Sequence, residues 1–111
     1  MTTEQLRQYI PLKKEQRQIE QRLRALENRP ESDSESLRPL RECYVSKLEE
    51  LVTAQLAIEK AIEALTPTER ELIRLRYIDG LDWHRVAAGI NYSDTQTYRL
   101  HARAVRKLKK L

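Results

Sequence analysis

Polar side chains recur near the end of the chain at the three- and four-residue spacing of one helix face. The set comprises Thr95, Gln96, Arg99, Ala102, Arg103 and Arg106. An arginine can donate two hydrogen bonds to guanine, a glutamine can pair with adenine, and a threonine can meet a base edge or a methyl group. The small Ala102 would permit close approach. This chemistry suits the major groove of DNA, with Thr95, Gln96 and Arg99 as the predicted base-reading residues.

Further basic side chains accompany this set and would suit contacts to phosphates. Such contacts add affinity without sequence preference. The predicted phosphate-contacting residues are His84, Arg85, Arg103, Arg106, Lys107, Lys109 and Lys110. The alternative interpretation is a solvated basic helix without a nucleic-acid partner.

Three helix-start signals predict the elements that would position these side chains. Thr66 can cap a helix that has Pro67 at its first position. Asp82 can cap a second helix after Gly80, a residue suited to the left-handed turn that ends the first. Ser93 opens a third helix, with a glutamine three residues later as in a capping box. Helices are therefore predicted near residues 67–78, 82–89 and 93–110.

The second and third of these helices are close enough in sequence to form a helix-turn-helix. Asn91, in the short connection between them, can adopt the left-handed conformation of a tight turn. The faces that would turn inward carry Trp83, Val86, Ala87 and Ile90 on one helix, and Thr97, Leu100, Ala104, Val105 and Leu108 on the other. We expect Tyr77, Trp83 and Tyr92 in the core, and His101 packed against a neighbouring helix. The alternative is a purely structural three-helix unit.

The first half of the chain has the pattern of two helices separated by a loop. A narrow apolar stripe from Leu12 to Leu26 predicts a helix that begins at about Pro11, after a short leading turn. Residues 28–39 are rich in proline, serine and acidic side chains, and they predict a loop. A heptad seam then runs from position 44 to position 65 with one polar member, Gln55. Together these elements predict an antiparallel, coiled-coil-like helical hairpin.

These patterns predict an all-α chain of two domains. Residues 1–64 would form the helical hairpin, and residues 65–111 a three-helix, helix-turn-helix domain that binds double-stranded DNA. Because two narrow seams bury little area, we expect the hairpin to form a homo-oligomer, most simply a dimer, or to dock on the second half. Gln55 could fix the register or the number of partners, or could simply be tolerated near the open end of the hairpin.

Charge is divided unevenly between the two halves. Residues 1–65 hold 11 Lys+Arg and 12 Asp+Glu, a net charge of −1, whereas residues 66–111 hold 10 and 5, a net charge of +5, and the sum is the +4 of the whole chain. A near-neutral half joined to a basic half is typical of a spacer or oligomerisation element attached to a polyanion-binding one.

No pattern indicates catalysis, a metal site or a cofactor. Cys43, His84 and His101 lack metal-ligand spacing such as CxxC or HxxxH. No glycine-rich phosphate loop, nucleophile elbow or carboxylate pair stands out. A single cysteine cannot form an internal disulfide, and no apolar run resembles a signal peptide or a membrane span. We therefore expect a cytoplasmic protein that is not an enzyme and has no membrane partner.

Two segments resemble a known family. LTPTERELIRLRYIDG (65–80) and NYSDTQTYRLHARAVRKLKKL (91–111) resemble the −35-reading C-terminal region of bacterial sigma factors, sigma-70 region 4. Within that class the chain is most similar to small phage-encoded transcriptional regulators of the ArpU and RinA type, which pair an N-terminal helical segment with a sigma-like helix-turn-helix. The resemblance implies a phage or prophage activator of late genes that binds promoters at the nucleoid of the bacterial host, with host RNA polymerase as a further expected partner.

The resemblance also assigns residues. Carried over by position, Asp94, Thr95, Tyr98 and Arg99 fall where sigma-like helices meet the −35 bases and adjacent phosphates, which adds Tyr98 to the base-reading set. Asp94 departs from the family, because many sigma-like helices have a basic residue at this position. It could read cytosine, repel phosphate or favour the helix N-terminus, and we expect the last.

Two other functions fit the same pattern. A small terminase subunit for phage DNA packaging also combines a helix-turn-helix with helical oligomerisation segments, and it would form a ring of many subunits. A sigma-like adaptor would bind RNA polymerase or another protein and contact DNA little.

Overall fold

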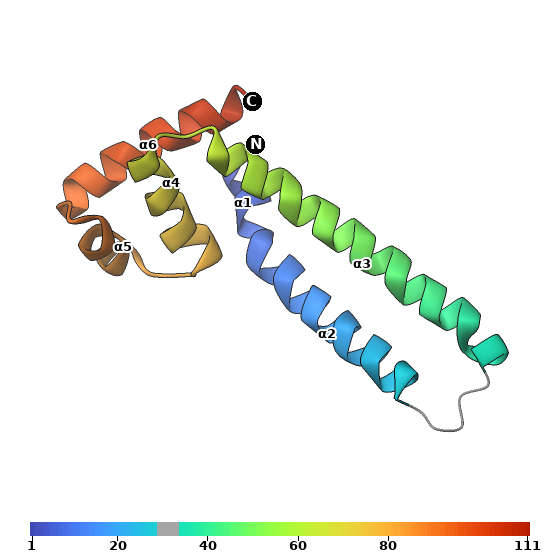
Figure 1. Ribbon diagram of the computed structural model, residues 1–111. Helices are drawn as coiled ribbons and strands as arrows, with labels where there is room; N and C mark the ends of the chain where they lie inside the picture. The colour runs from blue at the N-terminus through green and yellow to red at the C-terminus, as the bar shows by residue number, and fades with distance from the viewer. Residues whose placement is uncertain (29–33) are drawn as a thin grey trace. The chain divides into compact units, whose positions relative to one another are not determined.

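The computed structural model describes residues 1–28 and 34–111, and this part of the chain is helical without a strand (Figure 1). In chain order the elements are α1 (Thr3–Arg7), α2 (Tyr9–Glu27), α3 (Ser34–Glu63), α4 (Pro67–Ile73), a π-helical turn η1 (Arg74–Ile78), α5 (Trp83–Ile90) and α6 (Asp94–Lys109). The predicted all-α class is confirmed. Over the described ranges, no helix combines the length and the apolar character needed to cross a membrane.

The chain divides into two compact units. The hairpin unit is Pro11–Leu56, and the helix-turn-helix unit consists of Met1–Ile10 together with Ala57–Leu111. Residues 1–10 and 57–64, which the sequence pattern placed in the hairpin, thus belong to the same compact unit as the helix-turn-helix.

Burial and polar contacts explain why the first ten residues join the helix-turn-helix unit. Leu6 on α1 is fully buried. The Tyr9 hydroxyl donates to Glu59 Oε1 at 3.0 Å, and the Met1 ammonium donates to the Leu108 carbonyl at 2.9 Å. A cation is favourable at this end of α6, where helix carbonyls lack intrahelical partners.

In the hairpin unit, α2 and α3 run antiparallel side by side, as predicted (Figure 1). Ile19, Leu26 and Leu51 are buried. Gln55, the polar member of the seam, is also buried, and its Nε2 donates to Gln16 Oε1 at 2.7 Å. The polar position is therefore satisfied by a hydrogen bond across the two helices.

The predicted boundaries of the hairpin need correction. A short helix, α1, lies where a leading turn was expected, and α2 begins at Tyr9 with Pro11 in its first turn. Within the predicted loop 28–39, residues 29–33 lie outside the described residues, and residues 34–39 are helical, so the loop prediction is wrong there. Pro39 lies inside α3, near its start, and removes one intrahelical hydrogen bond there.

In the helix-turn-helix unit, the three predicted C-terminal helices are confirmed to within one residue at each end, with α4 and η1 together forming the first. These helices pack together in Figure 1 and share one core. The buried apolar residues of this unit include Ile58, Ile62, Leu65, Leu72, Ile73, Tyr77, Val86, Ala87, Leu100, Ala104 and Leu108.

Local hydrogen bonds begin and end these helices at the predicted residues. Glu69 Oε1 accepts from the Thr66 amide at 3.0 Å and from the Thr66 hydroxyl at 2.8 Å. Gly80 has the left-handed φ of 72°, and Asp82 accepts from the Arg85 amide at 2.9 Å at the start of α5. These contacts involve residues at most three apart, so the sequence alone could predict them.

The turn between α5 and α6 also has the predicted geometry. Asn91 has φ 59° and ψ 40°, the left-handed conformation, and caps the end of α5. Ser93 Oγ accepts from the Gln96 amide at 3.1 Å, and Gln96 Oε1 accepts from the Ser93 amide at 3.1 Å. The turn is thus fixed by one left-handed residue and a capping box.

Candidate nucleic-acid interface

Helix α6 has one buried face and one solvent face. Thr97, Leu100, Ala104 and Leu108 are buried, and Val105 is half-buried. Thr97 is the only polar residue in this buried group, and its hydroxyl donates a hydrogen bond to the Ser93 carbonyl at 2.8 Å. The opposite face exposes every member of the predicted outward set: Thr95, Gln96, Arg99, Ala102, Arg103 and Arg106. Side chains with the chemistry to read bases are therefore accessible within this unit.

The four predicted base-reading residues lie in the first two turns of α6, but their surroundings differ. Thr95 and Arg99 are exposed and one turn apart. Gln96 is exposed too, yet its side-chain oxygen is occupied by the Ser93 amide. Because a bidentate contact to adenine needs that oxygen, Gln96 would have to leave the cap to read a base. Tyr98 is 52% exposed, with its ring centroid 5.2 Å from that of Trp83.

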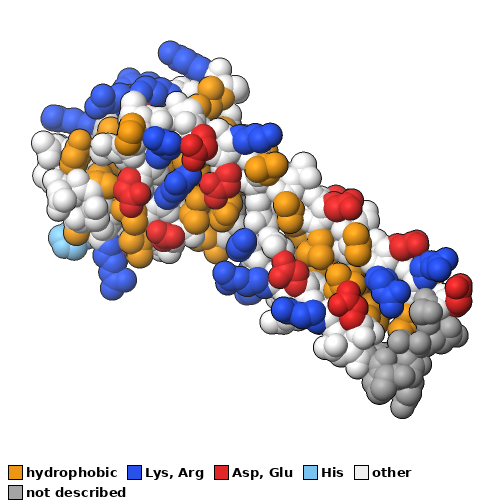
Figure 2. Space-filling model, in the orientation of Figure 1, with side chains coloured by type: hydrophobic (Ala, Val, Ile, Leu, Met, Phe, Trp, Pro, Cys, Tyr) orange, Lys and Arg blue, Asp and Glu red, His pale blue; other side chains and the backbone are white. Residues whose placement is uncertain are grey.

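Most of the predicted phosphate-contacting residues are exposed at the end of α6. Arg103, Arg106, Lys109 and Lys110 are all exposed, and within the described ranges none of them forms an ion pair with an acidic side chain. Figure 2 shows Lys and Arg side chains gathered along the edge of the molecule that α6 forms. Their charges remain uncompensated and available to a polyanion.

Lys107 differs from its basic neighbours, because its ammonium lies 2.9 Å from Oε1 of Glu69. The Glu69 side chain is only 1% exposed. Burial alone would raise the pKa of Glu69, but hydrogen bonds from Lys107 and Thr66 and the charge of Lys107 outweigh burial and lower it below its ordinary value. Lys107 therefore neutralises a buried carboxylate, a role that the sequence pattern did not indicate.

The two predicted phosphate contacts on α5, His84 and Arg85, are exposed and lie beside acidic side chains. Arg85 Nε is 3.8 Å from Oδ2 of Asp82, the N-cap of α5. His84 Nδ1 is 3.7 Å from Oδ1 of Asp94, the first residue of α6.

An aromatic cluster supports α6 from behind. The Tyr77 hydroxyl lies 2.7 Å from His101 Nε2, and the His101 ring meets Trp83 edge-on at 4.6 Å between centroids. Burial, followed by the charges of Arg76 and Arg7, lowers the pKa of His101 below its ordinary value. The predicted core position of Tyr77 and the packing of His101 are confirmed.

Two of the aromatic residues expected in the core are more exposed. Trp83 is half-buried, and Tyr92 is 40% exposed, so the core prediction for Tyr92 is wrong. Tyr92 directly follows the left-handed Asn91, and its amide donates to the Ala87 carbonyl at 3.0 Å. This backbone geometry leaves the Tyr92 side chain at the surface.

Sequence reasoning missed Arg76. Its guanidinium lies over the Trp83 ring at 4.6 Å and donates to the Leu81 carbonyl at 2.9 Å, joining η1 to the start of α5. The π-helical turn that contains Arg76 has a hydrogen bond from the Asp79 amide to the Arg74 carbonyl at 2.9 Å. A pattern search with helical period 3.6 carries no signal for a single π-turn.

The interface has no metal centre among the residues that the structure describes, where no three His, Cys, Asp or Glu side chains gather as ligands. Its chemistry rests on cations, amides and hydroxyls, which are the groups that hydrogen-bond to phosphates and base edges.

Comparison with known families agrees with this geometry. Residues 61–110 match the family model "Sigma-70, region 4", a segment that contains α4, η1, α5 and α6. No curated protein and no solved structure matches the chain. Residues 61–110 are therefore similar to sigma-70 region 4, and their last helices form a helix-turn-helix.

Proposed function

We propose that the protein is a sequence-specific regulator of transcription that inserts α6 into the major groove of promoter DNA. The orientation of α6 carries this proposal: Leu100, Ala104 and Leu108 are buried, whereas Thr95 and Arg99 are exposed. The family match over the same segment supports it.

The proposed role of each residue depends on its position along α6. Thr95, Tyr98 and Arg99 read bases, with Gln96 joining them if it leaves its cap, while the more distant Arg103, Arg106, Lys109 and Lys110 meet phosphates. His84 and Arg85 on α5 add contacts to the adjoining backbone. If four of these cations neutralise phosphates, the logarithm of the affinity should fall with the logarithm of salt concentration with a slope of about −4.

Binding-site selection from random DNA, followed by affinity measurements, tests the proposal. Arg99→Ala should cost about 1–3 kcal/mol on the selected site and relax preference at one base pair. Lys109→Ala is the matched control, because it removes a cation from the same helix and should weaken selected and random DNA similarly. Equal losses of Arg99→Ala on both DNAs would reject base reading by Arg99, and no binding to any duplex would reject the function itself.

We extend the proposal to a phage or prophage activator that acts at the nucleoid in the bacterial cytoplasm and contacts host RNA polymerase. The resemblance to regulators of the ArpU and RinA type supports this extension. Footprinting of a promoter with and without polymerase tests it: protection by the protein alone supports an autonomous regulator, and protection only with polymerase supports the adaptor. Light scattering that reports a ring of many subunits would favour the packaging protein instead.

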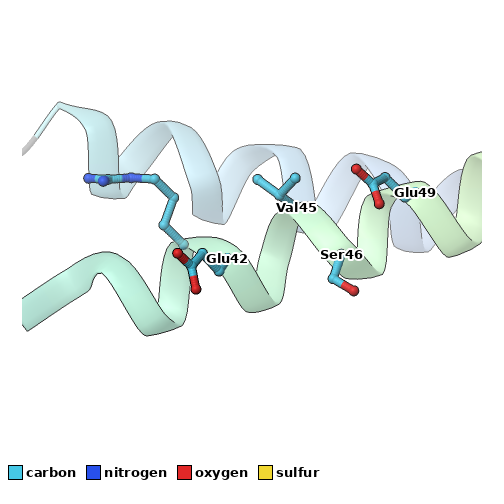
Figure 3. Close-up of a pocket in the computed structure, with 5 residues that line it drawn as sticks. Glu42, Val45, Ser46 and Glu49 are labelled. Carbon is cyan, nitrogen blue, oxygen red and sulfur yellow. The ribbon is translucent and has the colours of Figure 1, made fainter.

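An exposed apolar stripe on α3 supports self-association through the hairpin unit. Val45, Val52 and Leu56 form this stripe and are 41%, 47% and 49% exposed. Val45 lines a surface hollow of about 290 Å³ together with Arg41, Glu42, Ser46 and Glu49 (Figure 3). Three half-exposed side chains offer less than the ~800 Å² per partner of a standard interface. We therefore propose a weak homodimer that forms at high concentration or on DNA.

A further inference from the structure

A histidine and a carboxylate meet at the start of α6. His84 Nδ1, from α5, lies 3.7 Å from Asp94 Oδ1, and the two side chains are 87% and 59% exposed. Asp94 is the first residue of α6, so it lies one position before Thr95 of the base-reading set. The pair is therefore at the end of α6 that the proposed function places deepest in the groove.

An unpartnered carboxylate at this place would oppose binding. DNA carries one negative charge per about 1.7 Å of helix axis, so Asp94 would enter a strongly negative potential. A carboxylate oxygen can nevertheless accept a hydrogen bond from a base amino group, as Asp and Glu do from N4 of cytosine. A cation beside Asp94 in the complex would offset the repulsion from phosphates while the carboxylate accepts that hydrogen bond.

His84 is suited to supply that cation. A neutral imidazole becomes a cation by taking one proton from solvent, and histidine is the side chain that ordinarily changes charge near neutral pH. Near His84 lie Arg85 on α5, Asp82 at its N-cap, with Arg85 Nε 3.8 Å from Asp82 Oδ2, Tyr92 in the turn, and Asp94 at the start of α6. Of these, Asp94 is the group that His84 meets.

We propose that His84 takes up one proton when DNA binds, and that the resulting imidazolium holds the Asp94 carboxylate against a base amino group. His84 is then a positioning residue and Asp94 a base-reading residue. This inference rests on the proposed function and deepens it, because it assigns a specificity role to a residue that otherwise only favours the helix N-terminus. The second ring N–H of the imidazolium remains free to donate to a phosphate.

The other histidine of the chain does not compete for this role near neutral pH. His101 on α6 is half-buried and hydrogen-bonded to Tyr77, and burial together with the charges of Arg76 and Arg7 lowers its pKa. Because the pKa of His101 lies below its ordinary value, His101 is mostly neutral above about pH 7, and the His84→Gln variant separates any remaining contribution of His101.

Affinity for the selected DNA site at constant salt tests the pair. For the wild-type protein we expect affinity to fall as pH rises from 6.5 to 8.0, by up to about tenfold per pH unit, because one proton is bound with the DNA. His84→Gln should remove this dependence and bind at pH 6.5 as weakly as the wild type at pH 8.0. Asp94→Asn should reduce the dependence and change the preference at one base pair. Arg85→Gln, the matched control on α5, should lower affinity equally at every pH.

Calorimetry provides a second readout. Binding enthalpies in two buffers of different ionisation enthalpy count the protons taken up, and we expect up to one for the wild type and none for His84→Gln. DNA binding without proton uptake, or uptake that His84→Gln retains, overturns the inference and leaves the proposed function intact. Absence of DNA binding at every pH instead overturns the proposed function. Both residues are well exposed, so the variants should fold, and circular dichroism checks this.

Discussion

Lys107 and Lys109 lie two positions apart on α6, yet only Lys107 meets a buried carboxylate, that of Glu69. Lys107→Ala would leave the Glu69 charge buried without its cation. Because the Lys107 side chain is 45% exposed, the loss should fall below that of a fully buried pair, at about 1–3 kcal/mol in the free energy of unfolding. Lys109→Ala should leave stability unchanged. Urea denaturation of both variants checks this, and equal effects would argue against the pairing.

His101 links stability to pH. Its pKa in the folded protein lies below the ordinary value of 6.5, chiefly because the ring is buried. Below pH 6.5 the unfolded chain therefore binds a proton that the folded protein excludes. We expect the contribution of His101 to the free energy of unfolding to be complete above about pH 6.5. This contribution should decrease as the pH falls toward the pKa of the folded state.

Urea denaturation at pH 7.0 and 5.5 measures this effect, with His101→Gln as the comparison. Glutamine keeps an acceptor for the Tyr77 hydroxyl but does not titrate, so the variant should lose less stability on acidification. Lowered carboxylate pKa values such as that of Glu69 act in a more acidic window, below about pH 4.5. An unchanged pH dependence in His101→Gln would contradict the assignment.

At the scale of elements, the hairpin depends on a polar contact inside an apolar seam. Gln55 is buried and donates to Gln16, which in turn donates to Glu20 Oε1 at 2.6 Å. Gln16→Leu leaves the buried Gln55 amide without its partner, and Gln55→Leu leaves Gln16 Oε1 without its donor while the Gln16 amide still donates to Glu20. Each substitution should lower the free energy of unfolding by about 1 kcal/mol. The double variant should recover this loss, since both partners are then apolar.

A double-mutant cycle measured by denaturation tests that contact. Strict additivity of the two single substitutions would show that the amides do not stabilise each other. The double variant is also informative about register, because a polar residue in a seam specifies one alignment of helices at some cost in stability. Broader amide signals in its NMR spectrum would indicate that the alignment has loosened.

For the whole molecule, self-association should be weak and should depend on the exposed apolar stripe of α3. Sedimentation over a concentration series should show an average mass that rises from monomer toward dimer. Val52→Glu should suppress this rise, because it places a charge in the apolar stripe of Val45, Val52 and Leu56. Thr53→Glu, an exposed neighbour outside the stripe, is the matched control. A mass that is independent of concentration, or equal in both variants, would contradict the weak dimer.

The sequence by itself determined the features that depend on neighbouring residues. Thr66, Asp82, Ser93 and Asn91 mark helix ends because caps and left-handed turns join groups at most a few residues apart. The helical period likewise separated the buried face of α6 from its exposed face. The same period predicted the seam of α3, including its buried polar position, Gln55.

Only the tertiary structure decided which distant residues meet. Glu69 and Lys107 are 38 positions apart, and the Met1 ammonium and the Leu108 carbonyl are 107 apart. No local spacing encodes these contacts, nor the meeting of His84 with Asp94 across two helices. They arise because helices bury their apolar faces together, and that packing fixes which polar side chains at the margins become neighbours. The sequence thus determined which residues α6 presents to solvent, and packing determined which of their charges are already paired.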